Sequence, residues 1–140
     1  MPRLQTLKLN RNQIGDLGAQ ALARGLQGTT ALQLLWLWEN RIGDTGCQAL
    51  AAALAGHRGL RDLSLEANGF GDAGAKALGA ALQQMPRLQK LRLNQNQIGV
   101  KGAQALARGL EGTTALELLW LWENRIGDAG CEASTHRRAI

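Results

Sequence analysis

Leucines recur along this chain at a fixed spacing and alternate with polar or aromatic residues over short stretches. Five units of 28 residues follow one another without insertion, and their first leucines are Leu4, Leu32, Leu60, Leu88 and Leu116. Two further leucines in each unit stand two positions apart, which places them on one face of a short strand. An alanine- and leucine-rich stretch follows, in which residues such as Leu22 and Leu26 share one helix face. The pattern predicts a repeated strand–loop–helix unit.

Two polar positions punctuate the units. An asparagine stands where each predicted strand ends (Asn12, Asn40, Asn68, Asn96 and Asn124), and its amide is expected to satisfy backbone groups that lack ladder partners. An aspartate stands just before the helical stretch in four units, where we expect helix N-caps (Asp16, Asp44, Asp72 and Asp128). Val100 takes this position in the fourth unit, and we expect the lost cap to cost that unit's helix about 1 kcal/mol.

No unit can bury its leucines alone, so neighbouring units must stack to form a core. We assign residues 1–133 to five stacked repeats and residues 134–140 to a divergent tail, where Ser134 and Arg138 replace the two helix leucines. Residues 1–48 recur with few changes as residues 85–132, which indicates a duplicated block of three units. A complete protein and a segment of a longer array both fit this organisation.

The spacing L-x-x-L-x-L-x-x-N-x-I-G-D-x-G-A-x-A-L resembles the ribonuclease-inhibitor-like class of leucine-rich repeats. Uniform 28-residue units with asparagine at every turn are similar to the C-terminal arrays of NOD-like receptors, whereas Leu35-Trp36-Leu37-Trp38-Glu39 resembles strands of ribonuclease inhibitor. The resemblance implies an α/β solenoid shaped as a horseshoe, with parallel strands on the concave face and helices on the convex face.

Residues between the buried leucines of each strand should point to the concave face. Over the five units this face is expected to be basic (Lys8), aromatic, acidic, basic and aromatic in turn. All four tryptophans of the chain lie on it. Tryptophan is enriched at binding hot spots, although it could also serve only as cover for the sheet. We predict a partner-binding face made of Leu34, Trp36, Trp38, Glu39, Asp62, Glu66, Lys90, Arg92, Leu118, Trp120, Trp122 and Glu123.

The remaining candidate chemistry gives no catalytic constellation, and we expect no enzyme activity, cofactor or metal. Residues 69–74 spell G-x-G-x-x-G, but two of these glycines are ordinary repeat glycines, which argues against a dinucleotide site. Cys47 and Cys131 replace a repeat alanine and are expected to be small buried helix residues. His57 and His136 have no ligand partner at metal spacing, and both are expected at the solvated surface.

The net charge of +5 permits an acidic partner without identifying one, and the acidic third unit interrupts any basic groove for nucleic acid. The two cysteines suggest no disulfide framework, and the chain shows neither a signal peptide nor a membrane-spanning stretch, so a cytoplasmic location is expected. We predict a non-catalytic module that binds a protein on its concave face, as a sensing or scaffolding segment of a NOD-like-receptor-type protein. An inhibitor similar to ribonuclease inhibitor and a leucine-rich-repeat GTPase activator are the alternatives.

Overall fold

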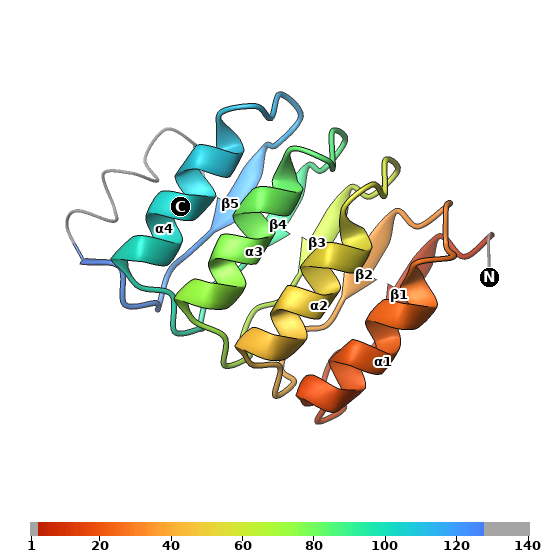
Figure 1. Ribbon diagram of the computed structural model, residues 1–140, viewed down its shortest axis with the longest axis horizontal. Coiled ribbons are helices and arrows are strands. Elements are labelled where there is room, and N and C mark those ends of the chain that lie inside the picture. The colour runs from red at the N-terminus through yellow and green to blue at the C-terminus, as the bar shows by residue number, and fades with distance from the viewer. Residues whose placement is uncertain (1–2, 128–140) are drawn as a thin grey trace.

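The computed structural model describes residues 3–127. Strands and helices alternate along the chain from β1 to β5 (Figure 1). Their bounds are β1 Thr6–Lys8, α1 Asp16–Leu26, β2 Leu34–Trp36, α2 Asp44–Leu54, β3 Asp62–Ser64, α3 Asp72–Leu82, β4 Lys90–Arg92, α4 Val100–Leu110 and β5 Leu118–Trp120. The expectations for Asp128, Cys131, His136 and the tail 134–140 fall outside the described residues.

The five strands form one parallel sheet in the order β1-β2-β3-β4-β5. Each residue pairs with the residue 28 positions further on, as Leu7 does with Leu35 and Leu35 with Leu63. The backbone ladder continues beyond the three-residue strands, because the amide of Glu39 still donates to the carbonyl of Glu66 at 2.9 Å. Equivalent residues of successive units are therefore stacked in straight rows across the sheet.

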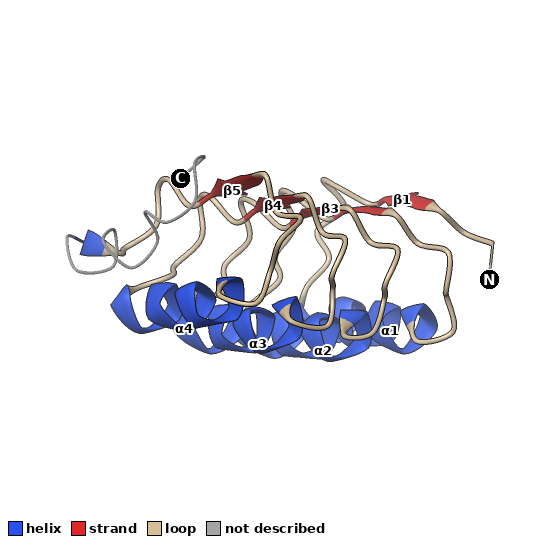
Figure 2. Ribbon diagram, turned by 90° about the horizontal axis from the view of Figure 1, so that it is seen from above, coloured by secondary structure: helices blue, strands red, loops and turns tan. Residues whose placement is uncertain are grey.

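The sheet and the helices form two layers, and the helices spread more widely than the strands (Figure 2). A helix is about 10 Å wide whereas neighbouring strands lie about 4.8 Å apart, so the stack must bend toward its strands. The α/β solenoid with a concave sheet and convex helices, which the resemblance implied, is thus confirmed. The strand and helix leucines meet between the layers, where Leu35, Leu63 and Leu91 are fully buried.

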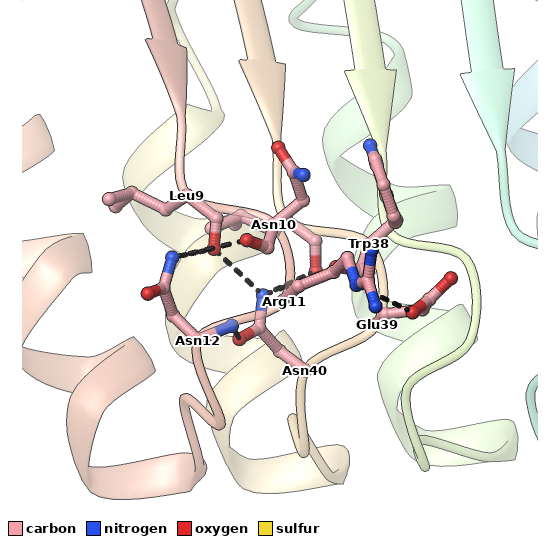
Figure 3. Close-up of polar contacts among 8 residues, drawn as sticks. Leu9, Asn10, Arg11, Asn12, Trp38, Glu39 and Asn40 are labelled. Carbon is pink, nitrogen blue, oxygen red and sulfur yellow. Dashed lines mark hydrogen bonds and ion pairs between the residues drawn. The ribbon is translucent and has the colours of Figure 1, made fainter.

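From the second unit onward, the asparagine of each repeat joins two units. The side-chain nitrogen of Asn40 donates to the carbonyl of Leu9 at 3.1 Å, and its oxygen accepts from the amide of Asn12 at 2.9 Å (Figure 3). The same nitrogen donates to the carbonyl of Leu37 at 2.9 Å, and the oxygen also accepts from the amide of Ile14 at 2.9 Å. The side-chain nitrogens of Asn68 and Asn96 likewise donate to carbonyls of their own and the preceding unit, and each side-chain oxygen accepts from one amide of the preceding unit. The structural role predicted for this row is confirmed, and it extends across the unit boundary.

The aspartates cap a different helix from the one that the sequence pattern suggested. Asp16, Asp44 and Asp72 are each the first residue of their own helix, whose N-cap is the preceding glycine and carries no side-chain cap. The carboxylate of Asp16 instead accepts hydrogen bonds from the amides of Gly43 and Gly46, at 2.8 and 2.9 Å, at the start of α2. Asp44 and Asp72 do the same for α3 and α4, so these caps also join neighbouring units.

This corrects the expectation for Val100. The valine begins α4, whose N-terminal amides are capped by Asp72, so the substitution leaves its own helix capped. Among the described residues, the backbone group that lacks this carboxylate acceptor is the amide of Gly127, which corresponds to Gly99 one unit earlier. Gly127 has φ +69°, whereas Gly99 has φ −101°.

Candidate protein-binding face

The concave face is built from rows that the 28-residue register aligns. A first row inside the strands runs Lys8, Trp36, Ser64, Arg92 and Trp120. A second row, just beyond the strand ends, continues the same ladder, and we call it the edge row: Asn10, Trp38, Glu66, Asn94 and Trp122. A third row, two residues before the first, holds Leu34, Asp62, Lys90 and Leu118. Ten of the twelve predicted face residues therefore lie in these rows, and Glu39 and Glu123 directly follow the edge row.

The four tryptophans differ in exposure. Trp122 is the most exposed, with 44% of its surface accessible, whereas Trp36, Trp38 and Trp120 are half-buried. The rings of Trp120 and Trp122 lie 6.5 Å apart and are tilted by 53°. The tryptophans thus cover part of the sheet and still expose aromatic surface to solvent.

Two tryptophans already hold a cation from the protein itself. The ammonium of Lys8 lies 4.5 Å from the centre of the Trp36 ring, and the guanidinium of Arg92 lies 5.3 Å from that of Trp120. Both distances are within the range of cation–π attraction. Trp38 and Trp122 have no such cation among the residues that the structure describes.

The charged side chains of the face are unequally engaged. Arg92 donates to Asp62 at 2.7 Å, and both side chains are at most 16% exposed, so this ion pair serves the face itself rather than leaving either charge for a partner. The pair was not anticipated from the sequence, although a residue two positions beyond the register partner is a diagonal neighbour on the next strand.

The other predicted carboxylates lie along the edge of the sheet. Glu39 forms an exposed ion pair with Arg11 at 3.3 Å (Figure 3), and Glu123 accepts from the side chain of Gln95 at 2.9 Å. Glu66 forms no ion pair with any residue in 3–127. An exposed pair such as Arg11–Glu39 contributes little stability, so Glu39 remains available to a partner.

Four polar atoms beneath this surface are buried and have no hydrogen-bond partner in the described part of the chain: Trp36 Nε1, Ser64 Oγ, Glu66 Oε2 and Asn94 Oδ1. They lie on three adjacent units and at the centre of the face. A single unpartnered buried polar atom is costly, and a cluster of them is typical of a site rather than of a core. Alternation places Ser64 and Asn94 on this face, but neither was among the predicted partner-binding residues, because their residue types alone carry no such signal.

The G-x-G-x-x-G stretch is not arranged to hold a phosphate. The amides of Gly71 and Gly74, which a phosphate would need, already donate to Asp44 at 2.7 and 2.8 Å. A second anion there would meet the charge of that carboxylate. The expectation against a dinucleotide site is therefore supported by a specific contact.

Cys47 is fully buried in α2, as predicted. Burial raises the pKa of its thiol well above the ordinary value, and the nearby carboxylates of Asp44 and Asp16 raise it further. Its sulfur lies 3.6 Å from the carbonyl oxygen of Gly74. The neutral thiol is thus a packing group, and a nucleophilic thiolate does not form there at physiological pH.

His57 corrects the expectation of a solvated side chain. It is only 7% exposed, and its Nε2 lies 2.9 Å from the carbonyl oxygen of Leu26 and 3.1 Å from the hydroxyl of Thr29. These contacts tie the loop after α1 to the loop after α2. Within residues 3–127, no group of three or more histidine, cysteine, aspartate or glutamate residues is placed to hold a metal ion.

A membrane-crossing helix is also absent from the described residues: none is both long and apolar enough.

The uniform register, the asparagine row and the two-layer stack together define a repeat solenoid of the α/β class. The family model described as Leucine Rich repeat matches residues 2–23, 37–51, 58–79 and 84–107, which is more than half of the chain. The chain belongs to the leucine-rich-repeat family.

Solved structures share this fold. A structure of the leiomodin-1 actin-binding site 2 superposes with a TM-score of 0.80 at 24% identity, over 96% of this chain and 79% of that one. An internalin, inlF of Listeria monocytogenes, superposes with a TM-score of 0.51 at 23% identity, over 99% of this chain and 47% of that one. Identities this low show the fold alone. Among curated proteins, none is similar enough to count as a relative.

Proposed function

We propose that this chain is a non-catalytic module that binds a protein partner on its concave face. The single observation that carries the proposal is the pair of aromatic residues Trp38 and Trp122 on the edge row. Both present ring surface at the sheet, and neither is occupied by a cation of the described residues. Tryptophan contributes more binding free energy per residue than almost any other type, provided that a partner covers it.

The predicted site residues take different parts in this proposal. Trp38, Glu39, Glu66, Trp122 and Glu123 would contact the partner directly. The internal contacts of Trp36, Asp62, Arg92 and Trp120 support a role in holding the face rigid, while Leu34, Lys90 and Leu118 would border it at the other end of the strands. A preorganised face loses less side-chain entropy on binding.

The repeat architecture supports a sensing or scaffolding role. Uniform 28-residue units are similar to the arrays of NOD-like receptors, and we assign the chain to a receptor-type segment of this kind in the cytoplasm. The unpaired thiol of Cys47 is compatible with a reducing compartment. That leiomodin-1 uses a similar fold as an actin-binding site makes actin a reasonable first candidate partner to test.

The test is a pull-down from cytosolic lysate, followed by direct binding measurements with each retained protein and with purified actin. Wild type is compared with a variant in which Trp36, Trp38, Trp120 and Trp122 are alanine, and circular dichroism checks that both fold. We expect wild type alone to retain a partner. Equal retention by both folded proteins, or none by wild type, would show that the tryptophans only cover the sheet.

A further inference from the structure

The edge row combines three features that point to one kind of ligand. Trp38 on the extension of β2 is followed across the sheet by Glu66, Asn94 and Trp122, one residue for each successive strand. Two uncovered aromatic rings thus flank a carboxylate and an amide. We infer that this row recognises two basic side chains of an extended segment in the partner protein, an inference that rests on the proposed function.

Glu66 has an unsatisfied carboxylate oxygen in the middle of the edge row. One of its carboxylate oxygens is buried without a hydrogen-bond partner, and the neighbouring Asn94 has its side-chain oxygen in the same condition. Asn94 is itself only 2% exposed. Both unpartnered atoms of the edge row are acceptors, whereas the unpartnered donors, Trp36 Nε1 and Ser64 Oγ, belong to the row inside the strands. An arginine or lysine of a partner would supply the edge row with both a donor and a positive charge.

The two rows of the concave face differ in whether a cation of the protein covers their tryptophans. Within the strands, Lys8 and Arg92 already cover Trp36 and Trp120. On the edge row the rings of Trp38 and Trp122 lack this cation, although carboxylates accompany them at Glu39, Glu66 and Glu123. The protein thus builds the same aromatic–cation contact twice internally and leaves it incomplete twice at the edge.

Other arginines of the same edge do not complete it. Arg11 pairs with Glu39 at 3.3 Å, with both side chains more than half exposed, so a partner can displace it at little cost. Arg41 and Arg125 are exposed and form no ion pair with a carboxylate of residues 3–127. The cation is therefore expected from outside the described part of the molecule.

The register sets the spacing of the two cations. Trp38 and Trp122 belong to strands three positions apart, which corresponds to about 14 Å at about 4.8 Å per strand. An extended peptide that crosses the strands advances about 3.3 Å per residue and covers this distance in roughly four residues. The ligand class is thus an extended segment with basic residues about four positions apart.

Long-range electrostatics does not explain such binding. The chain carries a formal net charge of +5, which repels a basic peptide at a distance. Attraction must therefore come from the local contacts of the edge row. Specific binding at the edge row and non-specific charge effects therefore predict opposite responses to a basic peptide.

The experiment is a titration of the purified chain, followed by calorimetry and by tryptophan fluorescence, with three synthetic glycine- and serine-based peptides. One has two arginines four positions apart, one has a single arginine, and one has two glutamates in place of the arginines. We expect the two-arginine peptide to bind at least about tenfold more tightly than the single-arginine peptide, because the second contact is intramolecular. The glutamate peptide is expected not to bind.

Two variants and a matched control locate the contact. Glu66→Gln should weaken the two-arginine peptide at least about tenfold, because the charge-assisted contact is lost while the side-chain shape is kept. Trp122→Ala, at the most exposed tryptophan, should reduce that peptide to the affinity of the single-arginine peptide. Glu111→Gln changes the net charge equally at the exposed end of α4 and should leave binding unchanged.

Absence of binding by the two-arginine peptide, equal effects of Glu66→Gln and Glu111→Gln, or preference for the glutamate peptide would overturn the inference. Its failure is distinguishable from that of the proposed function. If the tryptophan-dependent partner is still retained but neither Glu66→Gln nor the two-arginine peptide reduces its binding, the concave face binds protein through other chemistry. If wild type retains no tryptophan-dependent partner, the proposed function itself fails.

Discussion

The carboxylate of Asp44 caps the helix of the following unit through Gly71, whose amide donates to Oδ1 at 2.7 Å. The amide of Gly74 donates to the same oxygen at 2.8 Å. Asp44 itself lies in the first turn of α2, so its charge is placed favourably against the amino-terminal ends of two helices at once. These caps and the side chains of the asparagine row thus hydrogen-bond each unit to its neighbour.

Removing one such link should affect the unit that follows. Asp72→Ala leaves the amides of Gly99 and Gly102 without their acceptor, and we expect the free energy of unfolding to fall by about 1–2 kcal/mol. Urea unfolding measures the loss, and hydrogen exchange should show faster exchange at the start of α4. Asp72→Asn keeps an acceptor oxygen and should lose less. Equal losses in both variants, or faster exchange confined to α3, would contradict an inter-unit cap.

The converse change should strengthen the fifth unit. Val100→Asp would place an acceptor where Asp72 stands one unit earlier, opposite the amide of Gly127. We expect an increase of about 1 kcal/mol in the free energy of unfolding and slower exchange of the Gly127 amide. Val100→Asn should give a smaller gain, since it lacks the charge. No gain from either variant, with unchanged exchange at Gly127, would show that the φ of +69° at this glycine does not result from the missing acceptor at position 100.

The repeat explains why the fold was predictable. Strand leucines and the asparagine row follow from a period that allows one packing solution, and Leu35, Leu63 and Leu91 are all fully buried as expected. The cap positions were found from their residue type, but the sequence pattern favoured the nearest helix. In a stacked array, an aspartate in the first turn of a helix lies near the amino-terminal ends of its own helix and of the next one. Which of the two helices it caps depends on how closely the helices stack.

The site was less predictable because contacts between side chains depend on neighbours 28 or more residues away. The face residues could be selected by alternation, yet the pairing of Asp62 with Arg92 and the placement of Lys8 over Trp36 required the register. The expectation for His57 was wrong for the same reason, since its contacts are with Leu26 and Thr29 of the preceding unit. The residues next to each of these positions in the sequence do not predict such partners.

Stability at alkaline pH should depend on Cys47. Because burial raises the pKa of this thiol in the folded protein, its stabilising contribution is complete below the ordinary thiol pKa. It is lost as the pH rises beyond about 8.5, where the unfolded chain begins to release the proton. Urea unfolding of the Cys131→Ser chain between neutral and alkaline pH should therefore show a steeper loss than the same chain carrying Cys47→Ala. The alanine is the residue of sister units at Ala19, Ala75 and Ala103, so it is a conservative control. Parallel pH profiles of the two chains would refute this assignment.

Two glycines in nearly identical helices should respond in opposite directions to the same substitution. Gly109 in α4 is in such close contact with α3 that a β-carbon would overlap the carbonyl oxygen of Gly79. Gly25 holds the equivalent place in α1, within the same Leu-Ala-Arg-Gly-Leu sequence, and a β-carbon there would have no neighbour within 4 Å. Gly109→Ala should force the two helices apart and lower the free energy of unfolding by about 1–3 kcal/mol. Gly25→Ala should raise it by about 0.5–1 kcal/mol, because alanine loses less backbone entropy in a helix. Urea unfolding of both variants measures the difference, and a gain at both positions would mean that α3 and α4 approach each other less closely than this geometry requires.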